Sequence, residues 1–507
     1  MRPGALLRLA LAGTRTDLAR VILTALSAAL AALAGLAALT VLAIPTPPAT
    51  DDNGSRWSEQ YANQLLVEPG LRGGTAFALL LLVIPVLGLA GQCARLGAPA
   101  RDRRLAALRL AGATPGQVTL VAMAETGLAS LLGTLTGLAV YLAGHRLLHQ
   151  PDARGRLPLP TDVYPSTVGM AALVLGLPLV AALATALMLR RVATTPFGVV
   201  RKVRTRGPWP WPGLLIILGL AAFAAFRPVA LWYDRRLVQP PLWLLPALLV
   251  GGGLAAMIGV VTGTGWISHT TGRLLHRYAR RPAALLGARR LMADPWAGSR
   301  TFAALLAALI FGAGAAGFRA YFLATVELDG RTGAGMPSPD DFYLGTMDLV
   351  DLAVAVAMTI AAGGLLVALV EGIIARRRAY AALVAAGVPR GTLGRSILWQ
   401  SLAPAVPAIA IALAVGLLLI RGAFGSPSSG GFSQEICDAG EHLCTDEATR
   451  AQYARTEWVP KITVVPDVPV EQLAWLAAGA LVAVLVTVGV GVLFLRSSTA
   501  VEELRTT

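Results

Sequence analysis

Apolar residues in this chain come in long blocks separated by short polar or arginine-rich segments. A helix needs about 20 consecutive apolar residues to cross the roughly 30 Å core of a bilayer, and only helices or closed barrels satisfy the backbone inside lipid. Barrel strands instead alternate over about 10 residues. The pattern therefore predicts an all-α integral membrane protein. We expect ten transmembrane helices, at residues 21–44, 75–94, 118–142, 168–189, 213–232, 242–261, 302–324, 349–374, 397–420 and 473–495.

Two of these blocks need a separate argument. The first is longer than the apolar region of about 7–15 residues in a signal peptide, and no small-residue cleavage site follows Ile44. It is therefore predicted to stay in the mature protein as a span. The fifth block is interrupted by Arg227 and Pro228. If the fifth block does not cross the bilayer, the fifth and sixth blocks form a re-entrant or interfacial pair.

The formal net charge of +15 is unevenly distributed. Arginine clusters precede the first and seventh blocks and follow the second, fourth and eighth, whereas the alternate connections are mainly acidic. The positive-inside rule places the arginine-rich loops, and with them both termini, in the cytoplasm. Topology and anionic lipid explain the charge, and no basic groove with interleaved aromatic residues indicates nucleic-acid binding. The bias toward Ala, Arg, Gly and Leu favours a bacterial plasma membrane as the location.

One short segment occurs twice. Residues 103–113, Arg-Arg-Leu-Ala-Ala-Leu-Arg-Leu-Ala-Gly-Ala, resemble residues 378–388, Arg-Ala-Tyr-Ala-Ala-Leu-Val-Ala-Ala-Gly-Val. Each copy links two apolar blocks, which predicts two four-helix repeats joined by a two-helix insert, with small outer loops. The expected boundaries are 1–201, 202–282 and 283–507, and the longest outer loop is 421–470. An even number of spans in each repeat predicts parallel repeats related by an axis along the membrane normal.

The repeated segment itself predicts a short helix that ends at a glycine, Gly112 or Gly387. Alanine and leucine at helical spacing give the helix a small apolar face. Such a face on a loop serves either as a partner surface or as an interfacial helix lying on lipid headgroups. The pattern alone leaves both interpretations open.

Residues 103–117, which continue Thr-Pro-Gly-Gln after the first copy, resemble the FtsX-like/MacB permease family. The resemblance covers both four-helix repeats and implies a fused ten-helix permease of an ABC transporter. It implies that each repeated segment is a coupling helix that docks into an ATPase subunit. The positions implied to couple are Arg103, Arg104, Leu108, Gly112 and Thr114 in the first copy and Arg378, Leu383, Gly387 and Arg390 in the second.

The chain departs from that family in three respects. Val388-Pro389-Arg390 replaces the usual continuation in the second copy, and Gln400 stands where the first copy has Glu125. The large extracellular domain common in such permeases is also missing, which argues against a peptide-capturing or envelope-spanning role.

A nucleotide site of its own is not expected in this chain. A P-loop needs lysine directly after glycine, and neither Lys202 nor Lys461 follows one. A separate ATPase subunit, in two copies for two coupling helices, must therefore bind ATP and magnesium, and no cofactor is expected on the permease. His145 and His149 have the spacing of a metal pair, but no clear third ligand stands nearby, so no metal site is predicted.

Two further pairs of residues carry predictions. Cys437 and Cys444 lie in the acidic outer loop, where paired cysteines oxidise, so we expect a disulfide that closes a hairpin within residues 432–453. Glu125 and Glu371 are the acidic residues expected at membrane depth, which is costly and often functional. Both lie near arginine-rich helix ends, so a structural role is favoured for them.

Three functions compete. The leading hypothesis is an ABC permease that exports or extracts a lipid, peptide or drug-like substrate, or transmits force across the membrane. The alternative is a non-transporting scaffold or signalling partner that regulates an extracellular or sensor protein. A secondary transporter ranks last, because broken helices and mid-membrane charges are scarce.

Overall fold

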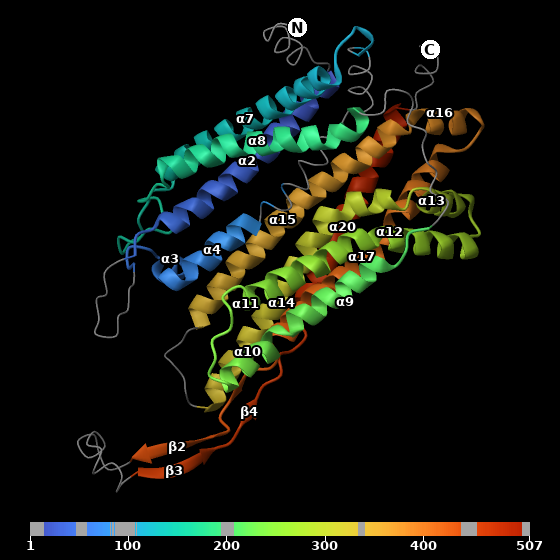
Figure 1. Ribbon diagram of the computed structural model, residues 1–507. Coiled ribbons are helices and arrows are strands. Elements are labelled where there is room, and N and C mark those ends of the chain that lie inside the picture. The colour runs from blue at the N-terminus through green and yellow to red at the C-terminus, as the bar shows by residue number, and fades with distance from the viewer. Residues whose placement is uncertain are drawn as a thin grey trace.

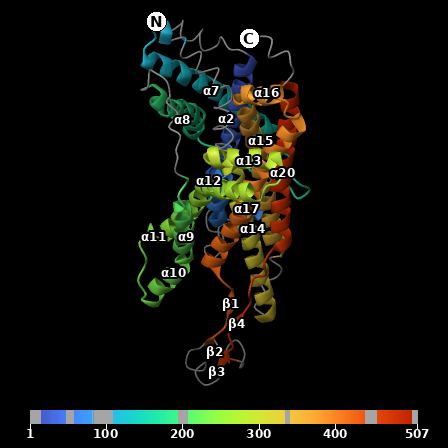
Figure 2. The ribbon, with the colours of Figure 1, turned by 90° about the vertical axis from the view of Figure 1, so that its right-hand side faces the viewer.

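The computed structural model describes residues 15–46, 58–81, 83, 86, 107, 109–193, 207–332, 340–437 and 454–498. Long helices dominate these residues, and the strands are confined to one projecting loop (Figure 1). One end of the long helices carries the repeated arginine-rich segments, and we call it the arginine-rich end. The opposite end carries the projecting loop and is called the hairpin end (Figure 2).

Nine helices or helix runs in the described residues are long and apolar enough to cross a membrane. This confirms the prediction of an all-helical multi-pass membrane protein. The expected second span begins in α4 (Pro69–Leu81), but most of it lies outside the described residues. The count of ten spans therefore stays a prediction.

The first group of helices consists of α2 (Arg15–Ala43), α7 (Pro115–Leu147) and α8 (Thr167–Ala193), with α4 packed on α2. Small residues let α2 and α7 approach closely. A side chain at Gly133 would overlap the backbone of Ala25, and one at Gly137 would lie 3.0 Å from Ala32 Cβ. Such contacts are the usual basis of helix association in lipid, where apolar burial offers no driving force.

The second group consists of α14 (Trp296–Thr332), α15 (Asp340–Ala375), α17 (Arg390–Phe424) and α20 (Val470–Ser498). It contains the largest buried cluster, in which Leu305, Leu309 and Leu393 are almost fully buried. Gly416 of α17 lies against the Ile310 carbonyl of α14, so this pair also meets through a residue without a side chain.

The two-helix insert packs on the second group. It contains α9 (Trp211–Ala224), α10 (Phe226–Arg235), α11 (Leu244–Pro246), a π-turn at Ala247–Gly251 and α12 (Gly252–Tyr278). Helix α12 contacts α9, α14 and α17, and α9 also contacts α17. Short α13 (Pro282–Ala293) follows and lies against α12 and α17. The insert and the second group therefore form one packed assembly.

The predicted interruption of the fifth span is visible at Ala225, between α9 and α10. Pro228 cannot donate to the carbonyl four residues earlier, and its ring crowds that carbonyl. Neighbouring hydrogen bonds continue across the break, from Ala225 N to Ala221 O at 2.9 Å and from Val229 N to Ala225 O at 3.0 Å. The run of α9 and α10 together remains long enough to cross a membrane.

The projecting loop contains two antiparallel ladders. Strand β1 (Ser428–Ser429) pairs with β4 (Ile462–Thr463), and β2 (Phe432–Cys437) pairs with β3 (Ala454–Val459). Figures 1 and 2 show β2 and β3 extending beyond the helices. The loop is therefore a longer β-hairpin than expected. Cys437 ends β2, but Cys444 lies outside the described residues, so the disulfide stays a prediction.

Candidate functional site

Both copies of the repeated segment end in the same backbone turn. Gly112 has φ +88° and Gly387 has φ +87°. In the second copy, α16 (Arg377–Ala385) is closed by hydrogen bonds from Gly387 N to Val384 O and from Val388 N to Leu383 O, both 3.0 Å. In the first, Gly112 N bonds Arg109 O at 2.9 Å. This left-handed helix terminator favours glycine, which confirms the predicted role of both glycines in ending the helix.

The next helix starts differently in the two copies. Thr114 caps α7, because its hydroxyl accepts from Gln117 N at 3.4 Å and its own N–H donates to Gln117 Oε1 at 3.0 Å. This reciprocal pair is a capping box. Pro389 precedes α17 and supplies no side-chain cap. The sequence departure at Val388-Pro389-Arg390 thus replaces a capped helix start with an uncapped one.

Apolar residues of both copies are open at the surface. In the first copy Leu110 is 91% exposed, and Ala385, which aligns with it in the second copy, is exposed as well. Leu383 is half-buried and packs against the core cluster of the second group. Leu108, which aligns with Leu383, lies outside the described residues, so the surface open to a partner is described by Leu110 in one copy and by exposed alanines in the other.

The structure describes only some of the other predicted coupling residues. Arg103, Arg104 and Leu108 lie outside the described residues, as does the side chain of Arg378 within α16. Arg390 is exposed at the start of α17. The coupling role of all nine positions stays a prediction.

Helix α16 is held by residues that the repeat comparison did not single out. Tyr380 is only 3% exposed; Arg290 of α13 donates to its hydroxyl, and the Arg290 guanidinium carbon lies 4.4 Å from its ring centroid. Arg376 Nη2 lies 3.4 Å from Asp294 Oδ2. The only sequence signal for these contacts was tyrosine at a position where the first copy has Leu105.

The two acidic residues expected at membrane depth lie in long helices near the arginine-rich end. Glu125 is in α7 and Glu371 is in the last turns of α15, and both are half-buried. Each has an interaction partner, so neither is an isolated charge. The structural interpretation of both residues stays a prediction.

The histidine pair of α7 has separate surroundings. His145 packs between Tyr141 and Tyr164, with ring centroids 5.4 and 4.1 Å away, and His149 Nδ1 lies 2.9 Å from Thr161 Oγ1. Among the residues that the structure describes, no group of three His, Cys, Asp or Glu side chains is placed to hold a metal ion.

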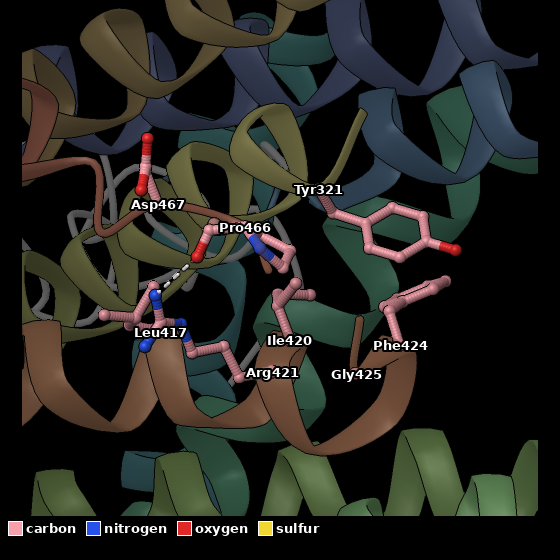
Figure 3. Close-up of a pocket in the computed structure, with 9 residues that line it drawn as sticks. Tyr321, Leu417, Ile420, Arg421, Phe424, Gly425, Pro466 and Asp467 are labelled. Atoms are coloured by element: carbon pink, nitrogen blue, oxygen red, sulfur yellow. Dashed lines mark hydrogen bonds between the residues drawn. The ribbon is translucent and has the colours of Figure 1, made fainter. Parts of the chain in front are cut away.

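A small recess opens at the hairpin end of the second group, between α14, α17 and the segment that leads to α20 (Figure 3). Tyr321 and Phe424 lie on one side, with ring centroids 5.3 Å apart. On the other side, Arg421 Nη2 donates to the Pro466 carbonyl at 3.0 Å. The recess thus offers mainly apolar contact, with its guanidinium already bonded to backbone.

Comparison with known proteins finds the FtsX-like permease C-terminal family in two places, residues 75–197 and 352–442. No curated protein and no solved structure matches the chain. Each matched region contains one copy of the repeated segment with its glycine turn and the long helix that follows. The matches at both copies, on a chain of long apolar helices, confirm the resemblance of this multi-pass membrane protein to the FtsX-like permease family.

Proposed function

We propose that this chain is the permease subunit of an ABC transporter and that its two glycine-terminated helices dock two copies of a separate ATPase. The observation that carries the proposal is the twofold family match, with one such helix inside each matched region. Two parallel four-helix repeats, residues 1–201 and 283–507, give the chain an approximate twofold axis. A dimeric partner suits such an axis.

The arrangement of helices indicates how force would pass. ATP and magnesium bind on the ATPase, whose closure presses on the first segment and on α16. The first segment continues directly into α7, and α16 lies directly between α15 and α17. Helix α17 has 35 residues, which gives a length of about 52 Å at 1.5 Å per residue. Although Pro404 and Pro407 interrupt its internal hydrogen bonds, a continuous helix of this length connects one side of the bilayer to the other and carries the displacement.

On the side of the membrane opposite the ATPase, this displacement exports or extracts a lipid, peptide or drug-like substrate, or acts mechanically on an outer partner. Arginine clusters near α13 and α16 support a cytoplasmic position for the arginine-rich end in a bacterial plasma membrane, with both termini inside. The hairpin with exposed Phe432 and Trp458 then lies outside. That exposed hairpin also favours the second candidate function, regulation of an extracellular protein without transport.

Co-purification with an ATPase tests the proposal. The chain is co-expressed with a candidate ABC ATPase and purified in detergent, as wild type and with Leu110→Asp plus Ala385→Asp. Both positions are exposed, so the changes put charge on the docking faces without entering the core. Val465→Asp is the matched control, because Val465 is 73% exposed near the hairpin end.

We expect the wild type and the control to retain the ATPase and the double variant to lose it. Failure of the wild type to bind any ABC ATPase, or binding that ignores the double change, contradicts the proposal. A complex that hydrolyses ATP and moves no substrate across the membrane favours the regulatory function.

A further inference from the structure

Helix α16 depends on its neighbours for its position. It has nine residues, and an isolated helix shorter than about 12 residues is marginal in water. Its one almost fully buried large side chain among the described ones is Tyr380, which meets Arg290 of α13 by a hydrogen bond and by stacking of guanidinium on ring. Arg376, just before α16, pairs with Asp294, just after α13. Arg290 in the last turn of α13 and Asp294 just after α13 therefore contact Tyr380 in α16 and Arg376 just before it.

Helix α13 in turn is wedged between two long helices. Ala288 is fully buried, and a Cβ at Gly287 would lie 3.1 Å from Ser396 O of α17. On another face, a Cβ at Gly272 of α12 would lie 2.9 Å from Leu291 Cβ. Interiors packed this closely transmit displacement because they leave no free volume to absorb it. A shift of α13 must therefore move α12 or α17 with it.

The first copy has a different residue at the position of Tyr380. Aligning Arg103 with Arg378 places Leu105 at the position of Tyr380. Leucine has no hydroxyl to accept from an arginine and no ring for the guanidinium to cover. The amino-acid sequence therefore does not repeat this arginine–tyrosine pair at the aligned position of the first copy.

We propose that Tyr380 and Arg290 are positioning residues that convert displacement of α16 into displacement of α13, and through α13 move the insert helix α12. The inference rests on the proposed function, because it assumes that an ATPase pushes on α16. It goes beyond that function by giving the insert a mechanical role that the second coupling helix drives.

Hydrogen exchange on the assembled permease–ATPase complex tests this inference. The ATP-induced change in exchange is measured for peptides covering α13 and the adjoining end of α12, alongside the affinity of the ATPase for the permease. Tyr380→Phe removes only the hydroxyl, Arg290→Gln removes the charge, and Arg290→Lys retains a cationic donor. The matched control is Arg277→Gln with Tyr278→Phe, an exposed arginine–tyrosine pair 5.8 Å apart on α12.

We expect Tyr380→Phe and Arg290→Gln to reduce the ATP-induced change in α13 by about threefold or more, without weakening ATPase binding. The two together should do no more than either alone, because they break the same contact. Arg290→Lys should restore part of the response, and the control pair should leave it intact.

The outcomes separate the two proposals. If the wild type binds no ATPase, the proposed function fails and the inference fails with it. If the ATPase binds and the α13 response is the same in Tyr380→Phe and Arg290→Gln as in the wild type, the inference is overturned and the proposed function stands. Loss of ATPase affinity in these variants also overturns it, because the pair would then serve docking.

Discussion

Polar contacts tie the helices within each group together, but through different residues. In the first group, buried Arg72 at the hairpin end bonds the carbonyls of Ile44 and Leu66 at 3.1 and 2.8 Å and Ser58 Oγ at 2.6 Å. In the second group, Tyr380 meets Arg290 at the arginine-rich end, and Arg421 bonds the Pro466 carbonyl at the hairpin end.

This difference shows what repetition preserves. The repeated sequence produces the same left-handed glycine turn in both copies, because a turn depends on local backbone geometry. The anchoring contacts involve residues that the two copies do not share, such as Tyr380, which aligns with Leu105. The described part of the first coupling segment includes exposed Leu110, whereas the second coupling segment places Tyr380 and Leu383 against the core of its own group.

Among the variants considered, we expect the largest loss of stability from a change at Arg72. Arg72→Met leaves several buried carbonyls without a donor, and we expect a loss of about 3 kcal/mol in the stability of the first group, the scale of a lost charged hydrogen-bonding group. Arg154→Met, at an exposed arginine of the nearby loop, is the control. Thermal unfolding in detergent measures both. Equal midpoints would show that the Arg72 contacts do not hold the first group.

A smaller loss of stability is expected from changes at the glycine turn that both copies share. Gly112→Val and Gly387→Val place a β-branched residue at positive φ, which costs about 1–3 kcal/mol. No atom lies within 4 Å of a Cβ at either glycine, so the cost is backbone strain and not a clash. Asparagine tolerates this conformation, so Gly112→Asn and Gly387→Asn should keep most of the stability. Equal thermal unfolding midpoints for the asparagine and valine variants would contradict the left-handed turn at these glycines.

Next is the outer tie of the first group at Tyr61, whose hydroxyl donates to Asp162 Oδ1 at 2.8 Å. Tyr61→Phe should cost about 1 kcal/mol, the usual net worth of one hydrogen bond. Burial, and then the hydrogen bond to Asp162, raise the pKa of Tyr61 above its ordinary value near 10.

The sign of the pH dependence follows from that direction. The unfolded tyrosine ionises first, so its stabilising contribution is complete below about pH 10 and is lost at higher pH. Unfolding midpoints of the wild type and Tyr61→Phe, compared between neutral pH and pH values above 10, should converge as the pH rises. If the difference between the two unfolding midpoints stays constant as the pH rises, ionisation of Tyr61 is not the cause of the difference.

The smallest effect on the fold is expected at Leu110. Because this side chain is almost fully exposed, Leu110→Ser should change the unfolding free energy by less than about 0.5 kcal/mol. Leu383→Ser, at a core-facing position two residues before Ala385, which aligns with Leu110, should cost more because it removes packing. Equal losses of stability in thermal unfolding would remove the contrast between these exposed and core-facing leucines.

Much of the helical architecture was predictable from the sequence. Long apolar blocks gave the positions of the described spans, and Pro228 gave the break after α9, since both depend on neighbouring residues. Gly112 and Gly387 ended their helices as predicted. The β-hairpin was underestimated, because β1 and β4 are only two residues each and carry no periodic signal.

The amino-acid sequence by itself determined where helices begin, turn and end, because bilayer length and backbone sterics act over a few neighbouring residues. Only the tertiary structure decided that the insert packs on the second group, that Leu383 faces a core while Leu110 faces outward, and that Arg290 reaches Tyr380. In lipid every apolar face is acceptable to the solvent, so hydrophobic pattern cannot select which helices meet. Contacts between small residues and a few polar pairs make that choice.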